Sequence, residues 1–367
     1  MIGLLLTIGL CVTYAAIIQK RTDTGTDIRK PIRADLISLT LFFATLIAFC
    51  LFSGLRSSYN DTYVYRQTFI DLDPAKFNFS MVFEAYGGFE LFQVIIKRYI
   101  SDNPQFLILF TSVFINVLYV RYIFRYSKNL SASVFLYAIG IFVFSMGGVK
   151  QAMAMAVAIY AISAFLEKKY IKAIVLLLIA LTFHPYIICL VSIILLTKRV
   201  WSFRTIALMA VSVFLFINLD NFFSLISVFG KDYSQDSFAG YTINPMRVLV
   251  ESIPIILSLI YKDRINETKD TWLILGTNLS IISFSFIFLG LFFEPVYLGR
   301  LSTYFSIISM ISIPRMLKVA FVDKAEKVFT TIYFIIFFVY FVLDMTKLGS
   351  FGLFGDYFKQ VSFFSLF

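Results

Sequence analysis

The feature that most constrains this chain is a series of long apolar runs separated by short clusters of charged residues. The 367 residues are 59% hydrophobic and only 15% charged, whereas a soluble domain carries roughly 25% charged residues. Backbone N–H and C=O groups find no partners in hydrocarbon, so apolar runs of this length are expected to be helices. The 44 Phe and 21 Tyr residues suit helices that face lipid and end in aromatic belts. The sequence therefore predicts an all-α, polytopic integral membrane protein.

The apolar runs predict about 11–12 hydrophobic helices in a single transmembrane domain that covers residues 1–367. The first run lacks a preceding basic segment and is followed by Lys20-Arg21, which is typical of a retained helix and not of a cleaved signal peptide. The runs lie at 2–18, 35–54, 106–124, 130–146, 151–166, 173–183, 186–196, 204–219, 247–261, 272–293, 301–314 and 328–343.

The distribution of Lys and Arg predicts the topology of these helices. One alternate set of loops holds 21 of the 32 Lys and Arg residues, although the opposite loops are longer. The positive-inside rule places the richer set in the cytoplasm and both chain termini outside. The formal net charge of +10 is therefore attributed to membrane topology, and a nucleic-acid partner is not indicated.

One stretch breaks this alternation of sides. Lys168-Lys169 and Lys198-Arg199 both belong to the cytoplasmic set, yet the apolar stretch between them, 173–196, suffices for only one crossing. Two half-helices resolve the conflict, because Pro185 disfavours a helical conformation at His184. We expect a re-entrant hairpin with His184 at its apex. The alternative is a single kinked helix that is an exception to the charge rule.

Three predicted outer loops and the C-terminal tail contain many of the polar residues. The largest loop, 56–105, ends in an amphipathic stretch at 91–99 that predicts a helix at the membrane interface. The other outer segments are 220–246, 294–300 and the tail 344–367. The three cysteines lie in apolar runs without CxxC spacing, so neither a disulfide framework nor a metal site is predicted.

Five cations lie close to helix ends on the predicted outer side. An arginine there offers a planar fork of donors that matches phosphate oxygens, and several converging cations would neutralise a diphosphate without a metal. The alternative role for each is that of a snorkelling or salt-bridged surface residue. The five are Arg56, Arg66, Lys150, Arg247 and Arg300.

His184 is the only histidine in the chain. A lone histidine is most often structural, but irregular backbone at depth in a membrane normally lines a cavity, and an imidazole suits a general base. Asp61, Glu84 and Glu90 are alternative bases, whose other expected role is to pair with neighbouring arginines. Glu251 lies within a predicted span, where a carboxylate is expected to be paired or to face a cavity.

Lys150-Gln151 follows Gly147-Gly148 and opens a helix rich in small residues at 152–158. Small residues allow helices to pack closely, and a helix N-terminus offers free N–H groups to an anion. Both interpretations can hold together, so Lys150 and Gln151 are candidate anion-binding residues.

These landmarks, in this order, resemble the EpsG-like branch of the Wzy-type bacterial polysaccharide polymerases. Their order, spacing and topology carry the resemblance over most of residues 50–305. The family commonly has an Arg-Gln pair where this chain has Lys150-Gln151, and lysine keeps the charge but loses the bidentate fork. The matching pieces are Arg56…Asp61…Tyr65, Glu84…Gly87-Gly88-Phe89-Glu90-Leu91, Gly148-Val149-Lys150-Gln151…Ala154, Lys168-Lys169…Phe183-His184 and Gly299-Arg300-Leu301…Tyr304.

The resemblance implies a metal-independent glycosyltransferase with a GT-C-like multi-helix architecture and no cofactor. Such an enzyme joins repeat units carried on undecaprenyl diphosphate at the outer face of the bacterial cytoplasmic (inner) membrane, in O-antigen, capsule or exopolysaccharide biosynthesis. It transfers the growing chain from its lipid diphosphate to a non-reducing-end hydroxyl of another lipid-linked unit. Its implied partners are the lipid-linked oligosaccharide and the bilayer, with a chain-length regulator and a flippase as candidates.

On that basis His184 is the first candidate for the catalytic base and Asp61 is the second. Tyrosines of the large outer loop, among them Tyr59, Tyr63 and Tyr86, are candidates for stacking on sugar faces, and interfacial anchoring is their alternative role. The residues expected to bind the diphosphate or the sugars are Arg56, Arg66, Lys150, Gln151, Arg300, Arg247, Glu84, Tyr65 and Tyr304.

Two other functions stay open from the sequence. A lipid-linked single-sugar glycosyltransferase or an O-antigen ligase also uses outer loops and cations, but usually has a larger soluble loop or a paired-carboxylate motif. A flippase-type transporter of lipid-linked glycan would be expected to show inverted repeats and polar groups at mid-membrane.

Overall fold

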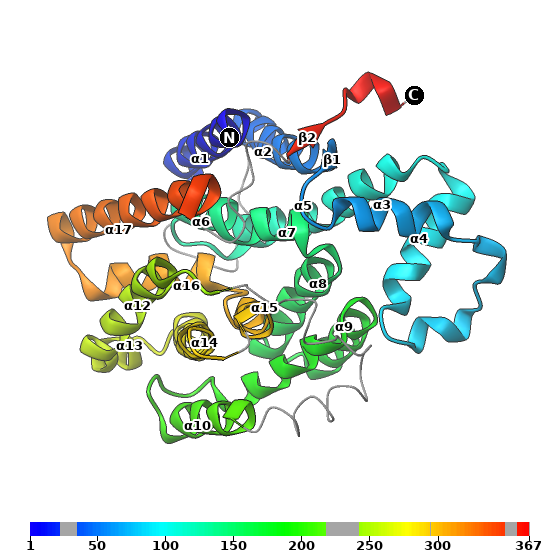
Figure 1. Cartoon of the computed structure of the whole chain (residues 1–367). Coiled ribbons are helices and arrows are strands. Elements are labelled where there is room, and N and C mark those ends of the chain that lie inside the picture. Colours follow the sequence, from blue (N-terminus) through cyan, green and yellow to red (C-terminus); the bar gives the residue numbers. More distant parts are fainter. Residues whose placement is uncertain (23–34, 218–241, 294, 349–357, 367) are drawn as a thin grey trace. The chain divides into compact units, whose positions relative to one another are not determined.

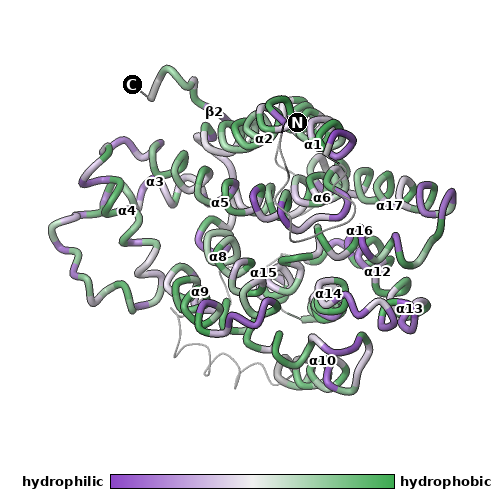
Figure 2. The backbone as a smooth tube through the Cα atoms, turned by 180° about the vertical axis from the view of Figure 1, so that it is seen from behind, coloured by the Kyte–Doolittle hydropathy of each residue, from purple (hydrophilic) through white to green (hydrophobic). Residues whose placement is uncertain are grey.

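The computed structural model describes residues 1–22, 35–217, 242–293, 295–348 and 358–366 (Figure 1). Within this part of the chain, seven helices are long and apolar enough to span a membrane, or eight if one bent pair counts as a single span. Figure 2 shows that the helices are mostly hydrophobic along their length, with hydrophilic residues concentrated towards their ends and in the connections. The predicted all-α, polytopic membrane fold is therefore confirmed.

The chain divides into two compact units, which are described separately. Unit 1 comprises Met1–Ile187 and Leu353–Phe367, and unit 2 comprises Ile188–Gly352. The elements of unit 1 are α1 (Ile2–Thr22), α2 (Leu36–Gly54), β1 (Arg56–Ser58), α3 (Thr62–Asp71), the 3₁₀ turns η1 (Pro74–Lys76) and η2 (Phe79–Phe83), α4 (Gly87–Tyr99), α5 (Pro104–Tyr126), α6 (Leu130–Tyr137), the π-helical η3 (Ala138–Phe142), α7 (Val143–Gly147), α8 (Val149–Leu166), α9 (Tyr170–Phe183), the start of η4 (Pro185–Leu195), β2 (Lys359–Gln360) and η7 (Phe363–Leu366).

The long helices of unit 1 begin where the sequence places capping residues. Asp35 accepts a hydrogen bond from Ser38 N at the start of α2, at 2.7 Å. Asn103 caps α5 by accepting from Gln105 N at 2.9 Å, and Pro104 follows at the first helical position, where its missing N–H costs nothing. These local signals explain why the predicted runs and the observed helices agree to within a few residues.

A hydrogen-bonded polar network lies buried where α2, α5 and α6 pack together. Asn116 on α5 is fully buried and donates to Ser112 O at 2.8 Å, while its side-chain oxygen accepts from the Tyr137 hydroxyl at 2.8 Å. The Ser53 and Ser112 hydroxyls bond to each other, and Ser112 Oγ is also placed to donate to Cys50 O at 2.8 Å. The network therefore satisfies polar groups that would otherwise be costly in an apolar interior.

The segment from α3 to α4 forms a lobe that is fastened by one lysine. Lys97 Nζ donates to the carbonyl oxygens of Phe69, Ile70 and Leu72, at 2.7–2.8 Å. These carbonyls end α3, so the ammonium group acts as its C-terminal cap. The predicted amphipathic helix at 91–99 is confirmed as the later part of α4.

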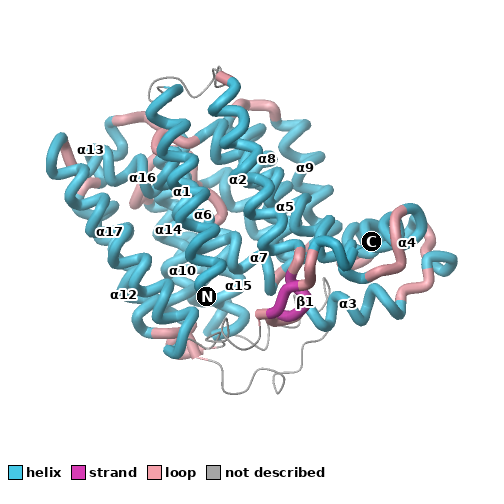
Figure 3. The backbone as a smooth tube through the Cα atoms, turned by 90° about the horizontal axis from the view of Figure 1, so that it is seen from above, coloured by secondary structure: helices cyan, strands magenta, loops and turns pink. Residues whose placement is uncertain are grey.

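The C-terminal tail contains a strand that the sequence does not predict. β2 pairs antiparallel with β1, and the strand segments are drawn in magenta in Figure 3. Arg56 is opposite Gln360 in this pairing. Because the two strands share hydrogen bonds, the tail must reach the same side of the membrane as Arg56.

Unit 2 is organised around the mostly buried helix α14, which packs against α10, α12, α15 and α16. Its elements are the rest of η4, α10 (Phe203–Ile217), α12 (Pro245–Ile260), α13 (Lys262–Glu267), α14 (Thr271–Leu289), α15 (Pro295–Phe305), α16 (Ser309–Ala320), α17 (Asp323–Leu343) and the π-helical η6 (Asp344–Leu348).

The structure corrects two expectations in this unit. The single span predicted at 301–314 is instead the pair α15 and α16, bent by 66°. Hydroxyl groups such as Ser306 Oγ, which donates to Thr303 O at 3.0 Å, compete for backbone carbonyls and favour such a bend. The loop predicted at 294–300 is helical from Pro295 onward, because proline suits the first turn of a helix. Most of the predicted loop 220–246 lies outside the described residues.

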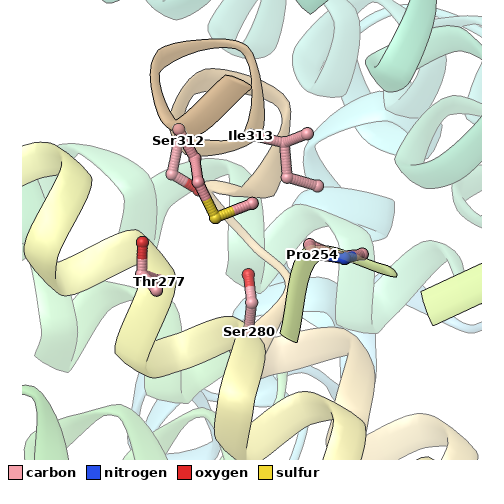
Figure 4. A pocket seen from close by; sticks show the side chains of 6 residues that line it. Pro254, Thr277, Ser280, Ser312 and Ile313 are labelled. Carbon is pink, nitrogen blue, oxygen red and sulfur yellow. The ribbon is translucent and has the colours of Figure 1, made fainter. Parts of the chain in front are cut away.

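A small pocket between α12, α14 and α16 marks close helix packing. Figure 4 shows Thr277 and Ser280 from α14 near Ser312 and Ile313 of α16 and Pro254 of α12. The space among these side chains does not admit even a water-sized molecule, whereas small-molecule sites are clefts of roughly 300–1,000 Å³. This pocket is therefore too small to hold a lipid-linked sugar.

We predict that Asn116→Leu lowers the stability of the detergent-solubilised protein by about 1–2 kcal/mol, because the Tyr137 hydroxyl loses its acceptor. Thermal unfolding of the purified variant measures the change. Thr40→Ala is the control, since this exposed hydroxyl bonds only to Leu36 O in its own helix. Equal melting temperatures for both variants would show that the buried network contributes nothing.

Candidate functional site

A row of cationic and aromatic side chains runs through unit 1 and contains several of the predicted site residues. The Tyr65 ring on α3 lies 5.8 Å from the Phe89 ring on α4. Lys150 Nζ on α8 lies 5.2 Å from the Phe89 ring centroid and 4.6 Å from that of Tyr86. The Tyr86 ring lies 5.3 Å from the His184 imidazole, edge to face. Segments far apart in sequence thus meet in one place.

Arg56 begins this row at the other end and is almost completely buried, with 1% of its surface exposed. Its Nε donates to Thr62 Oγ1 at 3.2 Å and its Nη1 donates to Ser53 O. Burial lowers the pKa of the guanidinium to about 10, while the nearby tyrosines Tyr65 and Tyr59 raise it. The side chain is still charged at neutral pH.

No ion pair joins Arg56 or Arg66 to a carboxylate among the described residues. Arg66 is instead held by Gln105, whose side-chain oxygen accepts from its Nη1. Gln105 Nε2 donates to Gly54 O at 2.8 Å and to Arg56 O at 3.0 Å. Desolvation lowers the pKa of Arg66 as well. One neutral amide therefore contacts both arginine segments, and no described carboxylate pairs with either arginine, which favours an anionic ligand.

The C-terminal tail supports the Arg56 segment from the other side. Val361 N donates to Leu55 O at 2.8 Å, and Gln360 Nε2 donates to Phe52 O at 2.7 Å. The Phe358 ring stacks on Phe52, with centroids 5.1 Å apart. These contacts hold the chain that immediately precedes Arg56.

Lys150 stands in the first turn of α8, beside the loop that precedes α3. A methyl group on Gly147 would lie 2.8 Å from Nδ2 of Asn60, so a larger residue there would require the Asn60 side chain to shift. The predicted opening of a helix at Lys150-Gln151 is confirmed. Gln151 is buried, and Lys150 is half-buried over its two aromatic rings.

His184 terminates α9 in an extended conformation, with φ −154° and ψ 115°, and Pro185 starts the next helical segment. The predicted break in the apolar stretch is therefore confirmed. His184 is 7% exposed. The chain enters unit 2 at Ile188, so the hairpin itself stays a prediction.

Tyr86 was singled out in the sequence only as one of several candidate sugar-stacking residues. Its backbone is left-handed, with φ 67° and ψ 9°, a conformation that costs a bulky residue about 1–3 kcal/mol. The signal in the sequence is the turn segment Tyr86-Gly87-Gly88. The sequence does not single out Gln105, although it is a polar residue at the start of an apolar helix.

The remaining predicted residues are either exposed in unit 1 or belong to unit 2. Asp61 and Glu84 are exposed. In unit 2, Arg247 forms an ion pair with Glu251 at 2.7 Å, which compensates its charge and supplies the partner expected for Glu251. Arg300 is half-buried and Tyr304 is buried, one turn apart on α15. Within the described residues, no group of three or more His, Cys, Asp or Glu side chains gathers as a metal site requires.

We predict that Val361→Pro releases the tail from β1, because proline lacks the N–H that bonds to Leu55 O and so forfeits about 1 kcal/mol. Faster proteolysis of the C-terminal tail in membranes would show the release. Val361→Thr keeps the N–H and serves as the control. Equal proteolysis of the two variants would contradict a supporting role for this hydrogen bond.

Comparison with known families places the chain in one of them. The model of the EpsG family matches residues 39–357, a range that includes every side chain of the row. No curated protein and no solved structure matches the chain. The match covers well over half of the sequence, and the chain therefore belongs to the EpsG family.

Proposed function

We propose that this protein polymerises oligosaccharide repeat units carried on undecaprenyl diphosphate, at the outer face of the bacterial cytoplasmic membrane. Membership of the EpsG family indicates a glycosyltransferase-type polysaccharide polymerase in a membrane. The observation that carries the finer proposal is the buried charge of Arg56, which no described carboxylate compensates. A diphosphate carries the negative charge that such a cationic site would bind.

The leaving group needs positive charge as it departs. In glycosyl transfer, the bond between the anomeric carbon and the diphosphate oxygen breaks and the electron pair stays with the diphosphate. We assign its stabilisation to Arg56, Arg66 and Lys150, with Gln151 beside them in the first turn of α8. Preorganised cations in a site of low dielectric stabilise developing charge efficiently.

The acceptor hydroxyl must lose a proton as its oxygen bonds to the anomeric carbon. We propose that His184 accepts this proton; it is the residue that ends α9 at the far end of the row. Asp61 is the second candidate, and its exposed position makes it accessible to an acceptor sugar. Tyr65 and Glu84 are proposed sugar contacts, because aromatic faces pack on sugar rings and carboxylates accept from hydroxyls.

The other predicted substrate contacts are in unit 2. Arg300 and Tyr304 stay in the proposal as substrate-binding residues on α15. Arg247 becomes a weaker candidate, because Glu251 already compensates its charge.

We predict that the purified protein converts an undecaprenyl-diphosphate-linked repeat unit into a ladder of products. His184→Ala should slow the reaction by about 10²–10⁴-fold, the usual contribution of a general base. Arg56→Lys keeps the charge but loses the fork and should retain partial activity, whereas Arg56→Gln should lose most of it. Gel separation of labelled products measures each rate.

The matched control is Lys76→Ala, which changes an exposed lysine on the same lobe with 84% of its side chain accessible. A single addition by the wild type would overturn polymerisation and favour a one-step glycosyltransferase. An undiminished rate in His184→Ala would remove His184 from the role of base.

We predict opposite sides of the membrane for the α3 lobe and the 166–172 segment. In a cysteine-free background, Tyr63→Cys should react with a membrane-impermeant maleimide on intact cells, because Tyr63 is 72% exposed. Lys172→Cys, also exposed, should react only after the membrane is permeabilised, as the positive-inside rule requires. The reverse pattern would place the proposed site in the cytoplasm.

A further inference from the structure

Tyr86 has a strained backbone conformation, although the residue that follows it is a glycine. It is the N-cap of α4, and its carbonyl oxygen accepts from Phe89 N at 2.9 Å and Glu90 N at 3.1 Å. Glycine adopts a positive φ at no steric cost, and Gly87 is the very next residue. The left-handed conformation nevertheless falls on the tyrosine. Such strain persists where the surroundings over-determine it, and it concentrates at functional sites.

The two glycines that follow Tyr86 hold it in place by close packing. A methyl group on Gly87 would lie 1.8 Å from Met81 O, and one on Gly88 would lie 2.1 Å from Thr182 Oγ1. Thr182 belongs to the last turn of α9, immediately before Phe183 and His184. The start of α4 is therefore pressed against the end of α9, and the Tyr86 side chain leaves the backbone at a fixed point beside His184.

The Tyr86 ring contacts both groups to which the proposed reaction assigns chemistry. Lys150 Nζ lies 4.6 Å from the ring centroid, within cation–π range. The His184 imidazole lies 5.3 Å from the same centroid with an angle of 80° between the planes. Tyr86 as a whole is partly exposed, although its hydroxyl oxygen is buried, so it is not simply a core residue that fills the interior.

We propose that Tyr86 is a positioning residue that holds the Lys150 ammonium and the His184 imidazole in one geometry for glycosyl transfer. The face of its ring orients the ammonium, and the edge-to-face contact sets the plane of the imidazole. The locked backbone keeps the ring from moving away, which preorganises both groups before substrate binds. This role rests on the polymerase function proposed above.

The test uses the fact that the chain has one histidine. Full-length protein in detergent, labelled with ¹⁵N and ¹³C in histidine, gives a single set of imidazole signals. We compare Tyr86→Phe, Tyr86→Leu and Tyr86→Asn with the wild type. Phe keeps the ring, Leu removes it, and Asn removes it while tolerating the left-handed backbone.

We expect the imidazole signals to stay in place in the Phe variant and to shift in the Leu and Asn variants, because aromatic rings shift nearby nuclei. Product-ladder formation should stay within about twofold of wild type for Phe and fall about tenfold for Leu and Asn, the size of a cation–π contribution. Asn with a normal melting temperature and low activity would exclude misfolding as the cause.

Each contrary outcome is distinct. An imidazole signal that Leu and Asn leave unmoved would show that the ring contact is wrong, whatever the activity. A shifted signal with an undiminished ladder would remove the positioning role and leave the polymerase function intact. A wild-type protein that forms no ladder would overturn the polymerase function and this role with it.

Discussion

The arrangement of unit 1 depends on how a charged guanidinium is buried with no carboxylate partner among the described residues. Arg56 loses most of its hydration, and it recovers hydrogen bonds from a backbone carbonyl and a threonine hydroxyl, both neutral groups. A neutral partner satisfies donors but does not cancel charge. Among the described residues nothing cancels this charge, and in a region of low dielectric its electrostatic attraction to an anion is strong. An ion pair at Arg56 would stabilise the ligand-free protein but would weaken its attraction for an anion.

Neutral and aromatic groups also contact the other cations of the row. Arg66 is held by the amide of Gln105, and Lys150 is held by the faces of two aromatic rings. The acids of the lobe, Asp61 and Glu84, stay exposed and form no ion pair with either arginine. Amides and π-faces orient cations without neutralising them. In unit 2 the opposite arrangement occurs, because Arg247 has Glu251 and Arg315 has Asp270 at 2.9 Å. Ion pairing there stabilises the helices and leaves less charge for a ligand.

The sequence predicts features whose signal spans a few neighbouring residues, and it misses features that depend on contacts between distant segments. Helix positions and the break at His184 depend on apolar length, caps and one proline, all of which act over a few residues. The pairing of Arg56 with Gln360 joins segments about 300 residues apart, and two short strands carry no periodicity that predicts it. The bend between α15 and α16 arises from serine and threonine hydroxyls that a hydropathy run does not register. The contacts of Tyr86 depend on glycine packing against α9, which only the tertiary structure shows.

The lysine at position 150 gains a physical explanation from this geometry. A guanidinium is a planar fork suited to bidentate contacts with phosphate, whereas an ammonium is a compact point charge. Arg56 and Arg66 already supply two forks at one end of the row. At the other end, the Lys150 ammonium lies over two rings that meet at an N-cap with fixed backbone. In the proposed site, the cation–π contacts with Tyr86 and Phe89 orient this ammonium.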